Sequence, residues 1–299
     1  MELIFNHLET KKKIYAQDAY MTFAKSILHL PIFQSVKNGE RKRTELKIDS
    51  LYGYKNVEMR FYPLSVGFDF DVFYYILQKK IKSEKLSFTI DLNLFMKFHK
   101  VHPSNKKVYI EKLKLSLDNM LDFYLKFSYG PKTYKCHLLT HVEENEENRE
   151  EIKITFSKFF ENFYKHDPDL IFNLQLDQFK EISGDYAKML YMFYFTNKYE
   201  AAVEFKIESI MKRLNSEEYD RKEVLKNIKK AHEQLISIGF LKSVKPIKNG
   251  RELAGYEIEF EKRRGKPLTE PKEKEKEKEK EKEKNITADL SLCDEELPF

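Results

Sequence analysis

Cysteine, glycine and proline are scarce in this sequence. There are two cysteines, Cys136 and Cys293, and nine residues each of glycine and proline among 299. Two widely separated cysteines are too few for a disulfide-stapled fold, so we expect a protein of a reducing compartment, the bacterial cytoplasm. With so little glycine and proline, long irregular loops are not expected in the body of the protein.

Apolar runs long enough to cross a membrane are also missing. No segment approaches the ~18 consecutive apolar residues that a spanning helix requires. The first residues include the acidic Glu2 and lack the apolar stretch of a signal peptide. We therefore expect neither export nor a membrane partner.

The motifs of enzymes that act on nucleic acids are absent from the sequence. No Walker A pattern occurs, which argues against ATP use. Rolling-circle nickases use a His-x-His metal pair with a tyrosine nucleophile, and no such pair is present. A zinc site from His99, His102, Cys136 and His141 is disfavoured by its loose spacing, and Cys136 and His141 would point to opposite faces of a strand. We expect no catalytic residues, no metal and no cofactor.

Aromatic and basic residues are abundant. Hydrophobic residues make up 41% of the chain and aromatic residues 14%, which is enough for a real core in two domains. The net charge is +5, but residues 285–299 contain four acids and no lysine or arginine. The rest of the chain therefore carries about +9, a balance that favours a polyanionic partner, most plausibly nucleic acid.

Residues 220–260 are the most informative stretch. Five apolar residues recur at spacings of four and three and form one side of a predicted helix: Val224, Ile228, Ala231, Leu235 and Ile238. Asp220 with Glu223 resembles a capping box that would begin the helix, and Gly239 would end it. A β-hairpin is predicted next, with an alternating strand at 256–260.

Basic residues lie on the other side of this predicted helix. Lys222, Lys226, Lys229 and Lys230 oppose the apolar stripe, and Arg221 adjoins them; Lys248 and Arg251 follow on the hairpin. The ordinary alternative is a solvated helix face, but Glu233 is the one acid among these lysines. A helix with an apolar back and a basic front, followed by a basic hairpin, is the layout of a winged-helix DNA-binding domain.

A similar pattern occurs earlier in the chain. We expect helices at 18–30, 69–81, 93–99 and 105–124, a hairpin over 123–142, an exposed charged loop at 143–151 and a strand at 152–156. This order resembles that of the second half and predicts a structural duplication. In the first copy, Lys106, Lys107 and Lys112 are the candidate DNA contacts, but Asp118 and Asp122 lie near them. The first copy would therefore contact phosphates or form a homodimer.

The predicted fold class is α+β, with two tandem winged-helix domains followed by a disordered charged tail. We expect an N-terminal arm at 1–17, a first winged-helix domain at 18–165, a second at 166–262 and the tail at 263–299. Near-perfect alternation of lysine and glutamate at 270–284 is typical of a solvated linker.

The tail ends in a short motif that resembles the acidic C-terminal tip of bacterial single-stranded-DNA-binding proteins: Asp294, Glu295, Glu296, Leu297, Pro298 and Phe299. Phe299 can fill an apolar pocket while its carboxylate meets a basic group, and the acids steer the tip to a basic surface. The resemblance implies host replication or repair proteins as partners. Residues 289–293 also resemble a sliding-clamp-binding peptide, although both anchor positions differ.

Four segments resemble the replication initiators of iteron plasmids, closest to the TrfA type. They are LPIF at 30–33, FDFDVF at 68–73, SGDYAKMLY at 183–191 and EQLISIGFL at 233–241. The match in order and spacing covers about residues 30–245. It implies two tandem winged helices that bind direct repeats in duplex DNA at a plasmid origin, promote origin opening and recruit the host helicase and polymerase. It also implies no covalent chemistry.

Two other functions fit parts of the sequence. The tail and the aromatic content are compatible with a single-stranded-DNA-binding protein of a phage or plasmid. The predicted fold is compatible with a transcription repressor. Preference for duplex or single-stranded DNA distinguishes the first of these from an initiator.

Overall fold

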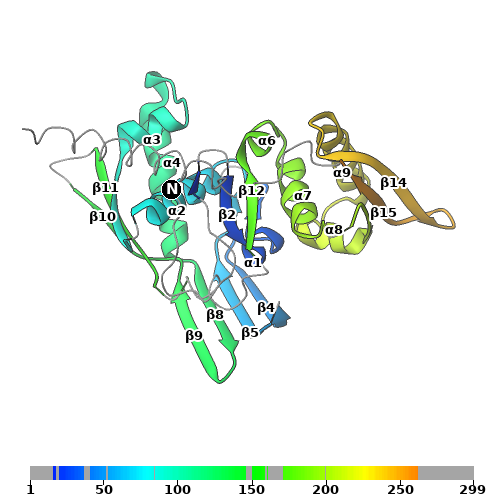
Figure 1. Cartoon of the computed structure of the whole chain (residues 1–299), viewed down its shortest axis with the longest axis horizontal. Coiled ribbons are helices and arrows are strands. Elements are labelled where there is room, and N and C mark those ends of the chain that lie inside the picture. Colours follow the sequence, from blue (N-terminus) through cyan, green and yellow to red (C-terminus); the bar gives the residue numbers. More distant parts are fainter. Residues whose placement is uncertain are drawn as a thin grey trace, which may run out of the picture. The chain divides into compact units, whose positions relative to one another are not determined.

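The computed structural model describes residues 16–17, 20–36, 41–51, 53–83, 85–145, 150–158, 160, 171–198 and 200–261. The chain divides after Glu261 into one compact unit, Met1–Glu261, and a second, Lys262–Phe299. The second unit lies outside the described residues, and so do all the predictions for the tail. The first unit is α+β, with helices and mostly antiparallel sheets (Figure 1). The expected domain boundary at 165/166 also falls outside the described residues.

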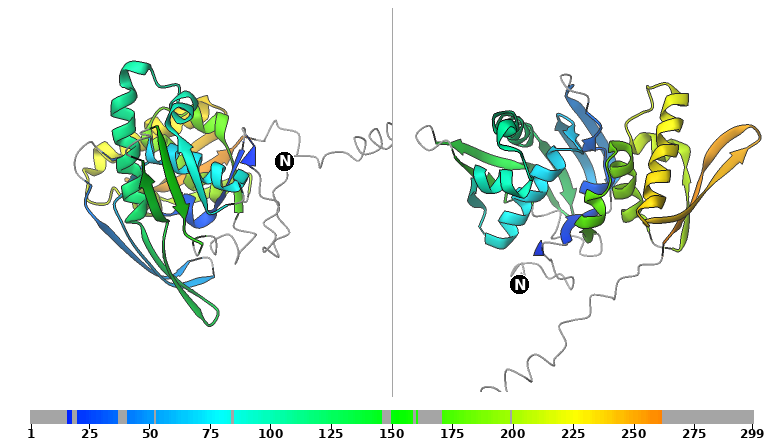
Figure 2. Two further views of the ribbon diagram at one scale, coloured as in Figure 1. Left: turned by 90° about the vertical axis from the view of Figure 1, so that its left-hand side faces the viewer. Right: turned by 90° about the horizontal axis from the view of Figure 1, so that it is seen from above.

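The helix and hairpin predicted over residues 220–260 are present, and a helix, a strand and a short helix precede them. They are α7 (Asp185–Thr196), β13 (Ala202–Lys206), α8 (Ile207–Arg213), α9 (Arg221–Ser237), β14 (Leu241–Asn249) and β15 (Glu252–Phe260). The strands form an antiparallel sheet in the order β13–β15–β14. We call these six elements the second repeat. Its hairpin, β14–β15, extends past α8 and α9 in Figure 1 and in the right-hand view of Figure 2.

The same elements occur earlier, and we call them the first repeat: α2 (Asp69–Ser83), β7 (Ser87–Asp91), α3 (Leu92–Phe98), α4 (Lys106–Leu121), β10 (Leu139–Glu144) and β11 (Glu151–Phe156). Their sheet has the equivalent order, β7–β11–β10. Three elements begin 115 positions before their counterparts, at Ser87 and Ala202, Leu92 and Ile207, and Lys106 and Arg221. Lys100 and Asn215, at the same separation, both have left-handed backbones, with φ of 52° and 49°.

The hairpin expected over 123–142 belongs to another sheet. β8 (Tyr124–Tyr129) and β9 (Lys132–His137) do form a hairpin, but they extend β4 (Thr44–Leu51) and β5 (Tyr54–Phe61) into a four-stranded sheet. The hairpin equivalent to β14–β15 is β10–β11, so the expected loop at 143–151 includes strand residues at both ends. In β11 the alternate residues Ile152, Ile154 and Phe156 are buried, because this strand pairs with β7.

The prediction of a helix over 18–30 was wrong for the first half of that range. β2 (Tyr20–Ala24) is a strand, and only α1 (Lys25–His29) is helical. β2 pairs with β1 (Ala16–Gln17) and with β12 (Ile171–Gln175), which lies between the repeats in sequence. Because β2 and β12 are far apart in the sequence, no local pattern in either strand indicates that they pair. The remaining short elements are β3 (Phe33–Gln34), β6 (Leu64–Ser65), the 3-10 helix η1 (Pro103–Asn105) and α6 (Leu176–Lys180).

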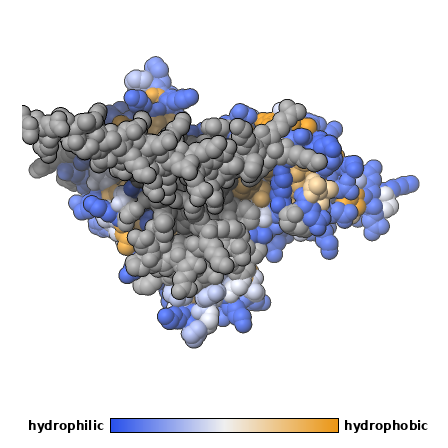
Figure 3. Space-filling view, viewed as in Figure 1, coloured by the Kyte–Doolittle hydropathy of each residue, from blue (hydrophilic) through white to orange (hydrophobic). Residues whose placement is uncertain are grey.

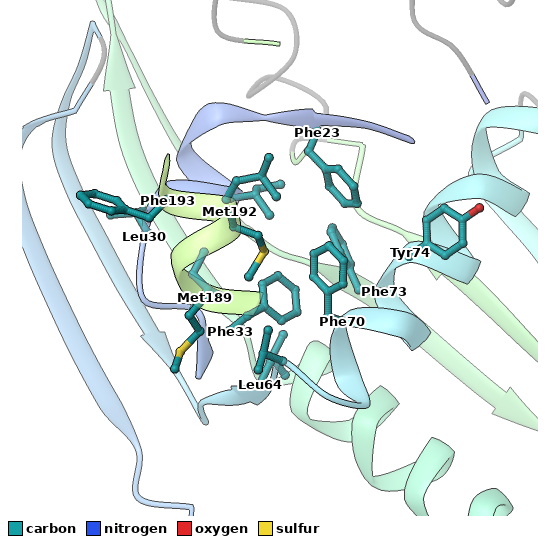
Figure 4. Packing of buried hydrophobic residues seen from close by; sticks show 14 of the residues in the cluster. Phe23, Leu30, Phe33, Leu64, Phe70, Phe73, Tyr74, Met189, Met192 and Phe193 are labelled. Atoms are coloured by element: carbon teal, nitrogen blue, oxygen red, sulfur yellow. The ribbon is translucent and has the colours of Figure 1, made fainter. Parts of the chain in front are cut away.

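One hydrophobic core runs beneath both repeats. Figure 4 shows Met189 and Met192 of α7 beside Phe33 and Phe70, which come from the first half of the chain. The rings of Phe33 and Phe70 meet edge to face at 4.9 Å. Burying a large apolar side chain stabilises a fold by about 1.5–3 kcal/mol, so this aromatic centre is a main link between the two repeats.

A buried arginine makes a second link. Arg213, at the end of α8, is 3% exposed and donates hydrogen bonds to the carbonyl oxygens of Leu28 (3.1 Å) and Phe33 (3.3 Å). Asn215 donates to the side-chain oxygen of Gln34 at 3.0 Å. The Arg213 bonds satisfy two backbone carbonyls of the first half, and the three bonds together hold residues 28–34 against the second repeat.

Candidate nucleic-acid interface

Helix α9 forms and faces the core as its sequence predicts. The Asp220 carboxylate caps its first turn by accepting a hydrogen bond from the backbone N–H of Lys222 at 2.8 Å. Gly239 follows its end in a left-handed conformation, with φ of 69°. Of the expected stripe, Val224, Ile228, Ala231 and Leu235 are buried and Ile238 is half-buried.

The opposite side of α9 is basic and open to solvent. Lys222, Lys226, Lys229 and Lys230, which we call the lysine face, are all exposed, and so is Arg221. Among the described residues the one ion pair on this face joins Lys229 to Glu233 at 3.9 Å, with both side chains mostly exposed. Such an exposed pair contributes little to stability, and Lys222, Lys226 and Lys230 make no ion pair with any described residue.

The β14–β15 hairpin divides its basic residues into two groups. Lys242 and Lys245 pair with Glu259 (2.6 Å) and Glu257 (2.8 Å), and the hydrogen bonds to these carboxylates raise the pKa of both lysines. Lys248 and Arg251 lie at the turn, are exposed and make no ion pair with any described residue. In Figure 3 the far end of this hairpin, at the right, is mainly hydrophilic. Positive charge is therefore available at the hairpin turn.

The first repeat presents a different surface on the equivalent helix. When α4 is aligned with α9 at the same separation of 115 positions, the buried sides of the two helices match, for example at Leu113 and Ile228. With this alignment, Glu111 occupies the position of Lys226 and Leu115 that of Lys230. Two lysines of the second repeat are therefore replaced by an acid and an exposed apolar residue.

The basic residues predicted on α4 are largely compensated or dispersed. Lys106 is 3.4 Å from the Glu150 carboxylate, Lys112 lies over the ring of Tyr109, and Lys107 is exposed. At the other end of α4, burial together with the nearby Glu144 and Asp122 carboxylates raises the pKa of Asp118. The structure thus brings the residues predicted on α9 together on one side, and places those of α4 in a mixed-charge setting.

A groove of about 1050 Å³ runs along one flank of α9. Asn227 and Lys230 line it from α9, and Arg41, Lys42 and Thr44 line it from the segment that enters β4. We call it the flank groove. The groove could not be predicted, because its two walls are separated by more than half of the chain and no pattern in either wall indicates the other.

The described residues contain no group of three or more His, Cys, Asp or Glu side chains placed to hold a metal ion. Cys136 is buried, and burial raises the pKa of its thiol to about 11, so the thiolate is scarce at neutral pH. Burial lowers the pKa of His99 to about 4. Both residues have the character of core groups. No helix in the described part of the chain is long and apolar enough to cross a membrane.

Comparisons with known proteins bear on the fold. No model of a known protein family matches the sequence, and no curated protein matches it. Among solved structures, the chain is similar to a crystal structure of domain 2 and domain 3 of RctB, with a TM-score of 0.53 and 11% sequence identity. The match covers 79% of this chain and 97% of that chain. It is a likeness of fold, and it gives no support to the narrower expectation of a TrfA-type protein.

Proposed function

We propose that this protein is a DNA replication initiator that binds duplex DNA through its second repeat. The lysine face of α9, in which Lys229 alone makes an ion pair with a described residue, carries the proposal, because an open row of cations on a rigid helix suits phosphate and base contacts in a major groove. The second repeat acts as a winged helix, with α9 in the major groove and the β14–β15 hairpin against the adjacent backbone.

The proposed roles of the basic residues follow from their positions. Lys226 and Lys230 lie along the exposed side of α9 and reach base edges or the phosphates beside them. Arg221 and Lys222, in the first turn, hold the end of the helix near one strand. Lys248 and Arg251, at the hairpin turn, contact phosphates and set the register without reading sequence.

Two likenesses support replication initiation over another use of the same fold. The four segments quoted above resemble initiators of iteron plasmids in order and spacing. The fold is shared with domains 2 and 3 of RctB, a replication initiator. Both support the initiator class, in which a protein binds direct repeats at an origin and promotes opening of the adjacent duplex.

In this proposal the protein acts by binding alone, in the bacterial cytoplasm and without cofactor or metal. Host proteins separate the strands and synthesise DNA. The acidic C-terminal residues Asp294–Glu296 and the Leu-Pro-Phe end dock on one of these host proteins. The lysine–glutamate stretch at 270–284 serves as the linker to that end.

Footprinting the protein on DNA that flanks its own gene tests the proposal. We expect protection of several direct repeats beside an AT-rich stretch, and a gel shift on repeat-containing duplex that unlabelled single strand of the same sequence does not compete away. Preferential binding to single strand, with no specific duplex complex, would reject the initiator and indicate a single-stranded-DNA-binding protein. Protection of one operator at a promoter, without repeats, would indicate a repressor.

A further inference from the structure

We infer that Arg41 and Lys42, in the first half of the chain, form a phosphate-binding edge for the same duplex that lies on α9. The inference rests on the proposed function, which places DNA on the lysine face. The predicted DNA contacts of the first half were on α4. The structure points instead to the segment that enters β4, on the far wall of the flank groove from α9.

The flank groove is continuous with the lysine face. Lys230 belongs to both, since it is exposed beside Lys226 and also lines the groove. A duplex that lies along α9 therefore places one sugar-phosphate strand at the mouth of the groove. In the right-hand view of Figure 2, β4 and β5 (blue) and α9 (yellow) lie on either side of the helices around α7.

The two cations on the opposite wall are held differently. Arg41 donates from Nη1 to the Asp69 carboxylate at 2.8 Å, and Asp69 is 1% exposed and also accepts from the backbone N–H of Ser65. A guanidinium has five N–H donors, so this bond fixes Arg41 and leaves donors for a phosphate. Lys42 is exposed and makes no ion pair with any described residue. Together they give one positioned and one mobile cation, a pairing suited to a phosphate backbone.

The acids of the groove determine where the strand passes. Asp185, Glu218 and Glu223 line the groove near the N-terminal ends of α7 and α9. Ser35 donates its hydroxyl to Asp185 at 2.9 Å. Lys230 lies seven residues beyond Glu223, about 10 Å further along the helix at the usual rise per residue. The strand is therefore expected to pass between Lys230 and the Arg41–Lys42 edge, on the side of Lys230 away from Glu223.

This edge explains how the first half can contribute to DNA binding although its own helix does not match α9. On α4 the positions of Lys226 and Lys230 are taken by Glu111 and Leu115, which provide no positive face. The bonds from Arg213 to Leu28 and Phe33 hold the preceding segment against the second repeat. Strand β3, which contains Phe33, pairs with β6, and Asp69 joins Ser65 of β6 to Arg41, so the Arg41 side of the edge is tied to the second repeat.

Duplex binding by full-length Lys42→Ala and Lys42→Glu variants tests the inference, measured by fluorescence anisotropy over a salt series. The matched control is Lys132→Glu, which removes an exposed lysine of β9. We expect Lys42→Ala to reduce the salt slope by about one. Lys42→Glu should weaken binding roughly three- to tenfold on repeat and unrelated duplex alike, as expected for a phosphate contact. Both variants should keep the wild-type thermal midpoint.

The outcomes separate this inference from the proposed function. If wild-type protein binds repeats, a Lys226→Glu variant loses binding, and both Lys42 variants behave like Lys132→Glu, the phosphate-binding edge is refuted and the proposed function stands. If wild-type protein forms no specific duplex complex, both fail. A Lys42 effect confined to one base position of the repeat would also overturn the inference, since it would indicate base reading.

Discussion

Glu111 occupies in the first repeat the position that Lys226 occupies in the second, on helices with coinciding buried sides. Leu115 and Lys230 form the next such pair along the same faces. The two repeats therefore share one scaffold but differ in the charge that they present to solvent. This difference predicts which repeat binds DNA, and it can be reversed by substitution.

Transferring the lysines to the first repeat is expected to create a second DNA-binding face. The Glu111→Lys, Leu115→Lys double variant should bind duplex DNA more tightly, roughly tenfold at low salt, with a salt slope steeper by about two. Both positions are exposed, so stability should change little. Asp49→Lys with Thr133→Lys, at exposed positions of β4 and β9, adds the same three charges and controls for them. Equal salt slopes for wild type and the double variant would refute this view of α4.

Acid is expected to destabilise the second repeat through His232. This side chain is 4% exposed, bonds the Tyr194 hydroxyl at 2.7 Å, and has its pKa lowered by burial from 6.5 to about 4. The unfolded chain takes up this proton below pH 6.5 and the folded chain only near pH 4, so the free energy of unfolding falls as pH drops through this window.

The size of this effect can be measured by urea unfolding at pH 7 and pH 5. At pH 5 the His232 contribution to the loss is about 2 kcal/mol, from ~1.4 kcal/mol per pH unit below 6.5. A His232→Gln variant keeps a polar partner for Tyr194 without titrating, and should lose correspondingly less. Burial lowers the pKa of His29 and His99 in the same way, so their losses remain in both proteins. Identical losses in wild type and variant would contradict the assignment.

Gly255 is expected to tolerate no side chain. A Cβ at this position in β15 would lie 2.3 Å from the carbonyl oxygen of Phe205, across the pairing with β13. Gly255→Ala should therefore destabilise the protein by about 1–3 kcal/mol through overpacking, seen as a lower thermal midpoint. The control is Gly184→Ala, where the nearest neighbour is a side-chain oxygen at 3.4 Å. Similar midpoints for the two variants would contradict this contact.

Removal of Phe299 is expected to separate DNA binding from partner binding. Without Phe299 the tail loses the side chain proposed to fill a pocket. Repeat-duplex affinity should equal that of wild type, whereas recovery of a purified host protein that binds acidic Pro-Phe tips should fall roughly tenfold. Unchanged recovery of that protein would count against the tail proposal.

The sequence was most informative where structure depends on near neighbours. The stripe of Val224, Ile228, Ala231 and Leu235 placed α9 and its buried side within a residue or two, because helical periodicity is local. Gly239 and the strand at 256–260 placed the end of the helix and the hairpin. Once the buried side of α9 was predicted, the lysines on its exposed side could be predicted as well.

Features that depend on distant partners could not be predicted. Residues 20–24 form a strand because β12 pairs with them, and a short apolar segment gives no sign of such a partner. The acidic residues at 143–151 favoured the prediction of an exposed loop where the hairpin β10–β11 lies. Strand β11 of this hairpin pairs with β7, which is distant in the sequence. The Arg41–Lys42 edge gains its proposed meaning only when the flank groove brings it opposite α9.

The central claim is that the lysine face of α9 binds duplex DNA, and a charge reversal on that face tests it most directly. Lys226→Glu with Lys229→Glu is compared with Lys132→Glu with Lys135→Glu, an equal charge change at exposed positions of β9. Binding to repeat-containing duplex is measured at several salt concentrations. We predict that the α9 variant loses specific binding while its thermal midpoint stays near that of wild type, and that the β9 variant binds normally. Specific binding retained by the folded α9 variant would contradict the account.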